Sequence, residues 1–527
     1  MRMFFWLALA LTLFSQPVQA KSPPPAPAAL DAQLKGALEC EQLARLDIGP
    51  IAGEPLSITR AKVVPASASF KEFCEVEGVI APQIGFTLRL PTQSWNGRYY
   101  QAGCGGLCGA VQIERCGEAQ TRDFAVAAQN MGHIGHYWTN AFWAEVPELR
   151  ADYGKRSTHL VAMASKAIIA AYYGHAPGKS YFQGCSTGGR EGLSSAYNYP
   201  GDFDGIVAGD MAFPVRQGAI QNNWNAWHML DADDREIFTK AKLELLHRAV
   251  MGECDGQDGL EDGIISDPRR CVFDPRSLEC PPGADAGDCL TRAQVLAAIA
   301  VYDGPRNSAG QRLSPGGAPY GSELFWNGRS NLDVTEVSLR HLVFPEARRN
   351  IHYRDFDWDK DIAAVEPQAA LLDAVPPRAE PDLSAFEGKG GKMIAYHGWA
   401  DGIPPGGLLD LYERVWRRQG GLDATRGWFR VFMVPGMGHC RGGDAPNTFD
   451  FLSAIVAWVE KGTAPDGVIA TQLNGDGSIK RTRPLYAYPS VAEYVGTGDA
   501  NEAANWRPAA PQSEPEDLID WIWAPSR

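Results

Sequence analysis

Residues 181–192 read YFQGCSTGGREG and contain the pattern Gly-x-Ser-x-Gly centred on Ser186. This pattern is typical of a tight turn between a strand and a helix, which exposes a serine hydroxyl where the strand ends. The sequence predicts a short strand over 180–184 and a helix over 188–197. Glycines before and after the serine leave room for the strained turn. We therefore expect Ser186 to be a nucleophile.

Strands and helices alternate on both sides of this turn. Strands are predicted over 87–92, 98–103, 124–130, 204–210, 392–398 and 428–436, and helices over 157–173, 406–419 and 449–462. Such alternation predicts one parallel or mixed sheet that is covered by helices and interrupted by a long insertion. The fold class that we expect is α/β, an α/β-hydrolase fold with a large inserted lid domain.

The insertion differs in composition from the segments on either side of it. It is rich in Gly, Pro and Asp and contains four of the 11 cysteines, so we expect a separate, loop-rich domain. The predicted organisation is a signal peptide over 1–20, a flexible leader over 21–39, a first core segment over 40–211, the lid domain over 212–388, and a second core segment with the C-terminal tail over 389–527.

The N-terminal stretch indicates export. Arg2 precedes an apolar run over 4–14, and Val18-Gln19-Ala20 fits a cleavage site; the run is too short to span a membrane. We expect a secreted or periplasmic protein. The formal net charge of −14 disfavours nucleic acid and anionic membranes, so neither is expected as a partner. The sequence predicts no oligomeric state.

A serine nucleophile needs a base, and the base needs a carboxylate to orient it. In this architecture the acid and then the histidine follow the serine along the chain, each after a strand. His439 follows the predicted strand over 428–436, and Asp401 follows the strand over 392–398. Asp410 is a weaker candidate for the acid because it lies inside a predicted helix. We expect Ser186, Asp401 and His439 to form the catalytic triad.

An oxyanion hole needs two backbone N–H groups aimed at the developing charge. The residue after the nucleophile, Thr187, is expected to supply one of them. The glycine-rich stretch GCGGLCG over 103–109 follows an early strand and is expected to supply the other.

Other histidines have simpler interpretations. His397 lies at a strand end near Asp401, and we expect a structural role. His133 and His136 have the spacing of a metal pair, but no third ligand is evident. His133 is the better candidate for a residue of the active-site floor.

Cys185 and Cys440 flank the two central catalytic candidates. If the Ser186 hydroxyl and His439 are hydrogen-bonded, their chain neighbours come within the usual Cα spacing of a disulfide, about 4.4–6.8 Å. In an exported protein we therefore expect a bond between Cys185 and Cys440 that links base to nucleophile. The number of cysteines is odd, so at least one thiol is free or pairs outside the chain.

An acidic stretch in the insertion, CDGQDGLEDGII over 254–265, indicates a metal site. Acidic side chains at this density, with glycines for tight turns, suit Ca²⁺, although the spacing is not that of an EF-hand. Backbone carbonyls of Leu260 and Ile264 are candidates to complete the shell. Cys254 and Cys271 bracket the stretch and are placed to clamp it. We expect structural calcium here.

These motifs together resemble the tannase and feruloyl esterase family. The resemblance rests on Cys185-Ser186, Asp401 and His439-Cys440, on WNGRYYQAGCGG over 95–106 and on the acidic stretch, and it runs from about residue 40 to 500. It implies the N–H groups of Gly106 and Thr187 as the oxyanion hole. It implies calcium ligands and further disulfides as well: Asp255, Asp258, Leu260, Asp262 and Ile264, and the pairs Cys40–Cys74, Cys254–Cys271 and Cys280–Cys289. Cys104, Cys108 and Cys116 fall outside that scheme, and a bridge among them is expected without a defined pair.

The resemblance implies a serine carboxylic-ester hydrolase that cleaves aromatic acid esters of the feruloyl, cinnamoyl or galloyl type through an acyl-enzyme. The substrate is expected to be a small aromatic ester, linked in nature to a polysaccharide or polyphenol. One alternative is hydrolysis of mono(2-hydroxyethyl) terephthalate, for which Arg340 is the only guess at a carboxylate anchor. A more remote alternative is a calcium-dependent binding protein on an inactive hydrolase scaffold.

Overall fold

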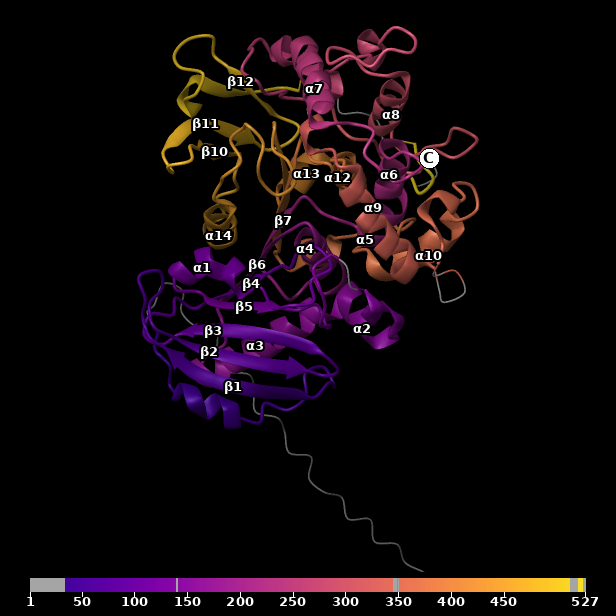
Figure 1. Ribbon diagram of the computed structural model, residues 1–527. Helices are drawn as coiled ribbons and strands as arrows, with labels where there is room; N and C mark the ends of the chain where they lie inside the picture. The colour runs from indigo at the N-terminus through magenta and orange to yellow at the C-terminus, as the bar shows by residue number, and fades with distance from the viewer. Residues whose placement is uncertain (1–33, 139–140, 345–347, 349, 512–519, 525–527) are drawn as a thin grey trace, which may run out of the picture.

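The structure is a computed structural model that describes residues 34–138, 141–344, 348, 350–511 and 520–524 (Figure 1). The predicted signal peptide over 1–20 and most of the predicted leader lie outside the described residues. Among the described residues, no helix is both long enough and apolar enough to cross a membrane.

One sheet of nine strands organises the chain, in the order β1-β2-β3-β5-β4-β6-β7-β8-β9. Its strands are β1 Leu56–Val64, β2 Phe73–Ile80, β3 Ile84–Pro91, β4 Arg98–Ala102, β5 Ala125–Gln129, β6 Lys179–Cys185, β7 Gly205–Gly209, β8 Lys392–Gly398 and β9 Phe429–Val434. The pairs from β5 through β4 to β9 are parallel, whereas β1, β2 and β3 pair antiparallel with one another and β3 pairs antiparallel with β5. The mixed sheet that the sequence predicts is confirmed.

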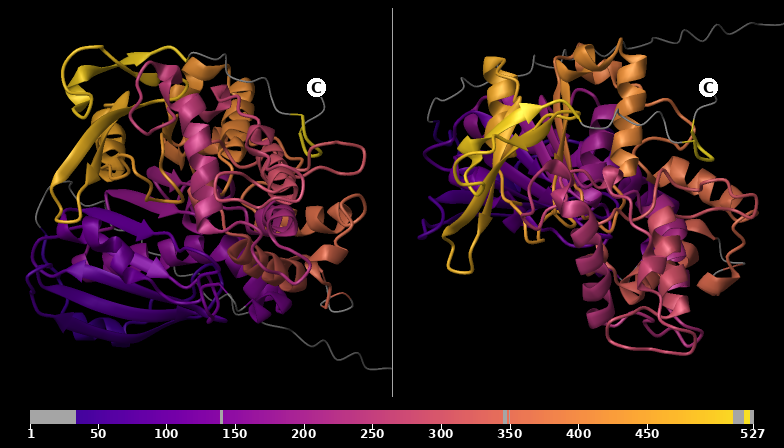
Figure 2. Two further views of the ribbon diagram at one scale, coloured as in Figure 1. Left: turned by 45° about the horizontal axis from the view of Figure 1, so that its top comes forward. Right: turned by 90° about the horizontal axis from the view of Figure 1, so that it is seen from above.

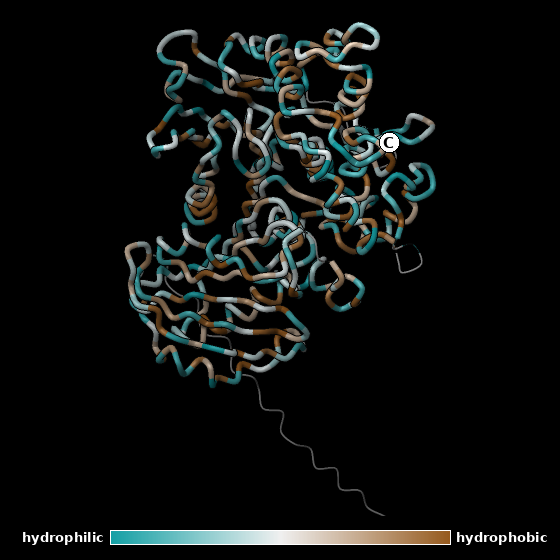
Figure 3. Tube along the Cα trace, in the orientation of Figure 1, coloured by the Kyte–Doolittle hydropathy of each residue, from teal (hydrophilic) through white to brown (hydrophobic). Residues whose placement is uncertain are grey.

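The two halves of the sheet bury different patterns of residues. Every residue of β4, β5 and β7 is buried, as expected for parallel strands with helices on both faces. Along β3 buried and half-buried residues alternate, and the tube in Figure 3 changes between brown and teal along these lower strands. The antiparallel strands β1 and β2, which the sequence did not predict, therefore extend the sheet as a partly solvated edge.

Helices cover both faces of the parallel half. Those outside the insertion are α1 Gly117–Thr121, α2 Pro147–Ala151, α3 Ser157–Tyr173, α4 Thr187–Asn198, α12 Gly406–Arg418, α13 Leu422–Arg426 and α14 Phe451–Lys461. Side chains of α3, α4 and α12 share one core with the sheet, and side chains of α1 and α14 share another core with it. The helix predicted over 157–173 and the strand predicted over 392–398 have the bounds that the structure gives them.

Residues 212–388 leave the sheet after β7 and return to it at β8. Their helices are α5 Pro214–Arg216, α6 Asn223–Met229, α7 Lys240–Cys254, α8 Arg292–Asp303, α9 Gly328–Val337, α10 Ile362–Leu372 and α11 Ser384–Gly388. In both views of Figure 2 most of this segment lies to one side, away from the indigo strands β1–β3. Much of it packs into two further cores, one of which also takes in residues around 104–153 and the C-terminal Trp521 and Trp523.

The C-terminal tail, whose sequence shows no clear periodicity, forms two hairpins. β10 Gly467–Leu473 pairs with β11 Ile479–Tyr486, and β12 Val491–Tyr494 pairs with β13 Trp506–Ala509. The backbone N–H of Tyr488 donates to the carbonyl of Val431 in β9 over 2.7 Å. This bond ties the hairpins to the edge of the main sheet.

Candidate active site

Ser186 lies in the turn between β6 and α4. Its backbone has φ +65° and ψ −124°, a conformation that is strained for a residue with a side chain. A Cβ added to Gly184 would lie 2.6 Å from the backbone carbon of Gly188, and one added to Gly189 would lie 2.2 Å from the carbonyl oxygen of Gly209. The glycines of the motif are therefore required by close backbone approach, and they present the serine at the carboxyl end of the sheet.

Asp401 and His439 meet beside this turn. Asp401 follows β8 and is fully buried, and its Oδ2 accepts a hydrogen bond from His439 Nδ1 over 2.8 Å. Its Oδ1 accepts the backbone N–H of Ile403 over 2.8 Å, and Oδ2 lies 3.1 Å from Nε2 of His397. His397 is fully buried as well, so it contacts Asp401 within the protein interior and does not face solvent.

The acid and the imidazole stabilise each other's charged forms. Burial alone would lower the pKa of His439, but the charge of Asp401 and its hydrogen bond raise it to about 9. Burial would raise the pKa of Asp401, yet the neighbouring imidazoles of His439 and His397 hold it well below its usual range. An ionised acid that holds the imidazole by Nδ1 leaves Nε2 as the nitrogen able to take a proton.

A disulfide joins the chain neighbours of the serine and the histidine. The Cα atoms of Cys185 and Cys440 are 6.0 Å apart and the two sulfurs are bonded. Ser186 and His439 line the same cavity. Both belong to the described residues, and no hydrogen bond joins the serine hydroxyl to the imidazole. Such bonds are often longer without substrate, and the disulfide limits how far the two residues can separate.

The glycine-rich stretch over 103–109 forms a loop against the start of α4. Gly106 has φ +57°, and a Cβ there would lie 2.7 Å from the carbonyl oxygen of Tyr137. The hydroxyl of Thr187 donates to the carbonyl of Gly106 over 2.7 Å, which fixes the orientation of this loop. Among the described residues, no acceptor reaches the backbone N–H of Gly106 or of Thr187. Both groups lie at the cavity and are available to a ligand oxygen.

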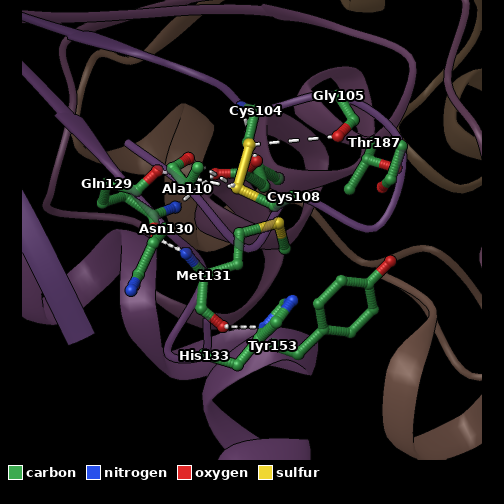
Figure 4. The surroundings of a disulfide bond; sticks show 12 residues. Cys104, Gly105, Cys108, Ala110, Gln129, Asn130, Met131, His133, Tyr153 and Thr187 are labelled. Atoms are coloured by element: carbon green, nitrogen blue, oxygen red, sulfur yellow. Dashed lines mark hydrogen bonds between the residues drawn. A yellow bond between two sulfur atoms is a disulfide. The ribbon is translucent and has the colours of Figure 1, made fainter. Parts of the chain in front are cut away.

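A second disulfide closes this loop. Cys104 and Cys108, four positions apart, are bonded (Figure 4). Along the sequence they flank Gly106. Cys116, the third cysteine that the sequence left unassigned, is a buried free thiol. The pairing could not be predicted, because three cysteines within 13 residues allow any pair and only the turn geometry selects one.

Buried polar groups anchor the start of the loop over 103–109. The carboxylate of Glu191 accepts the backbone N–H of Cys104 over 2.9 Å, the amide of Gln129 over 2.9 Å and the hydroxyl of Thr158 over 2.7 Å. Sequence reasoning missed Glu191, which gives no signal because it lies within the helix that follows the nucleophile.

His133 does not form the active-site floor that the sequence suggested. It is fully buried, stacks on Trp143 with ring centroids 4.1 Å apart, and is not among the residues that line the cavity. Tyr153, against which His133 also packs, lines the cavity in its place. The ring of Tyr153 packs against His133 and lines the cavity, and the spacing of histidines in the sequence cannot reveal such a ring.

The cavity has a volume of about 280 Å³ and is bounded by both parts of the chain. The core supplies the triad candidates together with Gly106, Thr187 and Tyr153. The insertion supplies aromatic rings and side-chain amides: Phe325, Trp326, Asn222, Asn225, Asn327 and Asn331. Within the described part of the chain, no lysine or arginine lines it. The cavity is therefore largely apolar, with amides as its main polar groups away from the triad.

Two candidates from the sequence lie elsewhere. Arg340 pairs with Glu336 one turn earlier over 3.1 Å and is not part of the cavity wall. Asp410 lies in α12 and pairs with Arg414 over 2.8 Å. Neither is placed to act on a substrate at Ser186.

The acidic stretch over 254–265 is closed by the disulfide Cys254–Cys271. Asp255 accepts backbone N–H groups of Gly263 and Ile264, and Asp258 accepts the N–H of Leu260. One oxygen of Asp262 pairs with Arg483, whereas its Oδ1 is buried without a partner among the described residues. Burial raises the pKa of Asp258, and the charge of Asp262 adds to that rise. Carboxylate and carbonyl oxygens are the ligands that Ca²⁺ prefers, and Asp262 Oδ1 is placed to take part, although among the described residues no three acidic side chains of this stretch bring oxygens within 4.8 Å of one another.

The remaining disulfides lie away from the cavity. Cys40–Cys74 joins the short 3-10 helix Cys40–Arg45 to β2. Cys280–Cys289 closes a short loop of the insertion. Five disulfides among the described residues fit an oxidising compartment.

Comparison with known proteins identifies what this chain is similar to. The family model described as tannase and feruloyl esterase matches residues 67–509. A mono(2-hydroxyethyl) terephthalate hydrolase from Piscinibacter sakaiensis is 34% identical over 86% of this chain and 87% of its own. A probable feruloyl esterase B-1 from Aspergillus terreus is 32% identical over 79% and 81%. The crystal structure of feruloyl esterase B from Aspergillus oryzae has a TM-score of 0.78 at 28% identity and covers 86% of this chain and 97% of its own.

Proposed function

The chain belongs to the tannase and feruloyl esterase family and is a carboxylic-ester hydrolase, and we propose that Ser186, His439 and Asp401 carry out the reaction. The observation that supports this assignment is the buried Asp401–His439 hydrogen bond, which a disulfide links to the strained serine turn at one cavity. The comparisons confirm the carboxylic-ester hydrolase that the sequence predicts; the serine nucleophile and the roles of the other residues are the proposal.

In the proposed mechanism His439 Nε2 takes the proton of the Ser186 hydroxyl as its oxygen attacks the ester carbonyl. The N–H groups of Gly106 and Thr187 stabilise the oxyanion, and the ionised Asp401 stabilises the imidazolium. His439 then gives the proton to the leaving alcohol oxygen, and the C–O bond breaks to leave an acyl-enzyme. Water, deprotonated by His439, attacks this ester, and the acid leaves as Ser186 regains its proton.

The proposed substrates are esters whose aromatic acyl group carries no charge, of the feruloyl, cinnamoyl or galloyl type; the feruloyl and galloyl groups carry phenolic hydroxyls. Phe325, Trp326 and Tyr153 give the cavity flat apolar surface for an aromatic ring. Asn225 and Asn331 add amides that suit phenolic hydroxyls, and Asn331 has no side-chain hydrogen bond within the described part of the chain. A natural ester linked to a polysaccharide or polyphenol is compatible with an open cavity mouth where Trp138 and Phe325 are partly exposed.

Terephthalate monoester hydrolysis is the second candidate, because a relative at 34% identity carries that name. Such a substrate has a free carboxylate, whose desolvation costs several kcal/mol unless a cation or donors replace its water. No lysine or arginine of the described residues lines the cavity, and Asp401 adds negative charge. We therefore place the phenolic esters first.

Initial rates on methyl ferulate, methyl gallate and mono(2-hydroxyethyl) terephthalate test this order directly. We expect kcat/KM for at least one phenolic ester to exceed that for the terephthalate ester by at least about 100-fold, because an unpaired buried charge costs about 3–5 kcal/mol. A terephthalate ester that is hydrolysed fastest would contradict the substrate assignment. Labelling by a fluorophosphonate at Ser186, absent in Ser186→Ala, tests the nucleophile and excludes an inactive scaffold.

We further propose that the acidic stretch binds structural Ca²⁺ through Asp255, Asp258 and Asp262 with the carbonyls of Leu260 and Ile264. The ion would cross-link the insertion and plays no part in the reaction steps. Chelation should lower Tm, Ca²⁺ should restore it, and Asp258→Asn should remove the difference. An unchanged Tm together with no metal by elemental analysis would contradict the site.

Export through residues 1–20 stays a proposal too, tested by the N-terminal sequence of the mature protein.

A further inference from the structure

A second buried carboxyl lies beside the Asp401–His439 pair. Asp210 follows β7 and Asp401 follows β8, and these strands are parallel neighbours. Because the carboxyl ends of parallel strands meet at one edge of the sheet, the two acids come together. One oxygen of each acid and one ring nitrogen of His439 all lie within 4.8 Å of one another. Both carboxyl groups are fully buried.

The two acids have different hydrogen-bond partners. Asp401 receives hydrogen bonds from His439 and Ile403 and contacts His397, the setting of an ionised carboxylate. Asp210 Oδ1 accepts the backbone N–H of Gly398 over 3.0 Å. Its Oδ2 lies 3.4 Å from the sulfur of Cys185, which is in a disulfide and has no proton to donate. Among the described residues no N–H or O–H donor reaches this oxygen, as expected of a carboxyl oxygen that carries a proton itself.

The charges around Asp210 agree with that assignment. The titratable groups that face it are Asp401, His397, His439 and Tyr396. Burial raises the pKa of Asp210 to about 7. His397, 3.8 Å from Oδ1, and His439 oppose the rise, and the charge of Asp401 adds to it. Two carboxyls this close in a dry site do not both ionise readily.

We propose that Asp210 is a positioning residue of the catalytic centre, a neutral carboxylic acid that donates a hydrogen bond to Asp401 and holds the end of β8 through Gly398. This inference rests on the proposed triad. A neutral acid at this place fixes Asp401 without a second negative charge. A second charge beside His439 would stabilise the imidazolium further and hinder return of its proton to the leaving alcohol.

The first test compares Asp210→Asn with Asp210→Ala. Asparagine keeps the shape, the donor and the acceptor of a neutral acid, whereas alanine keeps none of them. We expect D210A to lose at least about tenfold in kcat on methyl ferulate, with KM within about threefold, and D210N to recover most of the lost kcat. Equal losses in D210N and D210A would show that a charge is needed, and an unchanged kcat in D210A would show that no positioning occurs. Either result overturns the proposal.

A second test does not depend on activity. The pKa of Asp210 is raised in the folded chain, so between about 4 and about 7 the folded state keeps a proton that the unfolded state releases. The free energy of unfolding of the wild type therefore falls as pH rises through this window, whereas D210N has no such proton. The Tm of D210N minus that of wild type should increase from the lower to the upper end of the window. A difference that does not change with pH would overturn the neutral acid.

Ser186→Ala measured in parallel separates the two possible failures. Wild-type rates in S186A would contradict the proposed nucleophile, and the pH dependence of Tm would still decide whether Asp210 is neutral. An inactive S186A with equal losses in D210N and D210A would leave the nucleophile in place and overturn the role of Asp210.

Discussion

The core of this molecule and its insertion differ in how their residues reach the cavity. The core supplies Ser186, Asp401 and His439 from the ends of three strands of one parallel sheet, so a few hydrogen bonds and a disulfide place them. The insertion supplies aromatic rings and amides from loops and helices that pack in cores of their own. We infer from this difference that the core carries out the proposed chemistry and that the insertion selects the acid.

The largest effect that this comparison predicts is in the core. Asp401→Asn removes the charge that orients and stabilises His439, and kcat should fall by about 10⁴-fold. His439 acts only when unprotonated, so the rate falls as pH drops below its pKa, which Asp401 raises. In D401N the pH at which kcat/KM is half-maximal should move to lower values.

A matched control for this variant is Asp410→Asn. Asp410 is the other acid that the sequence offered, and it pairs with Arg414 instead of a histidine. D410N should retain kcat within about threefold of wild type even if its Tm falls, because it loses only a structural ion pair. A loss in D410N comparable to that in D401N would reverse the assignment of the acid.

The next largest effect concerns the link between serine and histidine. Cys185→Ser with Cys440→Ser should lower kcat by about 10–100-fold, because small misplacement of catalytic groups is costly. It should also lower the free energy of unfolding by about 2–5 kcal/mol. Cys280→Ser with Cys289→Ser removes a disulfide of the insertion and should leave kcat within about twofold. Steady-state kinetics on both double variants measure this. If the Cys280/Cys289 variant lost as much activity, the Cys185–Cys440 bond would have no special role in placing the catalytic residues.

A smaller effect is expected at the oxyanion loop. Cys104→Ser with Cys108→Ser opens the loop that carries Gly106. The hydrogen bond that the Thr187 hydroxyl donates and the one that Glu191 accepts both remain. Loosening one donor should cost less than removing it, and we expect a loss of about tenfold in kcat with little change in KM. A raised KM with normal kcat would assign the loop to substrate binding instead.

The smallest effect belongs to the insertion. Asn331→Leu removes an amide that suits a phenolic hydroxyl, at a cost of about 1–1.5 kcal/mol for the bond. The rate on methyl ferulate should fall by about tenfold, whereas methyl cinnamate, which lacks the hydroxyl, should react within about twofold of wild type. Equal losses on both esters would mean that the insertion supports the triad instead of selecting the acid.

The same division explains what could be predicted from the sequence. Ser186, Asp401 and His439 follow buried strands with clear patterns, so the order of these strands along the chain is enough to predict that the three residues meet. Glu191 lies within a helix and Asp210 lies at a strand end, and neither belongs to a motif. Their partners come from other elements, so only the folded chain shows them. Asn225 and Asn331 are far apart from Ser186 along the chain and meet it through the packing of the insertion, which no local pattern encodes.

Strands β1 and β2 were missed for a related reason. β1 exposes most of its residues and keeps only Ala61 buried, so it carries little of the alternation that marks a strand. Its place is fixed by pairing with β2, whose alternating burial gives a clearer strand signal than β1 carries.

Trapping the acyl-enzyme would show which residue is the nucleophile. Wild-type protein quenched during turnover of methyl ferulate should contain a peptide with Ser186 that is heavier by one feruloyl group, detected by mass spectrometry. The same peptide should be unmodified in S186A and should still carry the group in N331L, at a lower yield. A feruloyl group on another residue, or an equal amount of modified protein in S186A, would contradict the account.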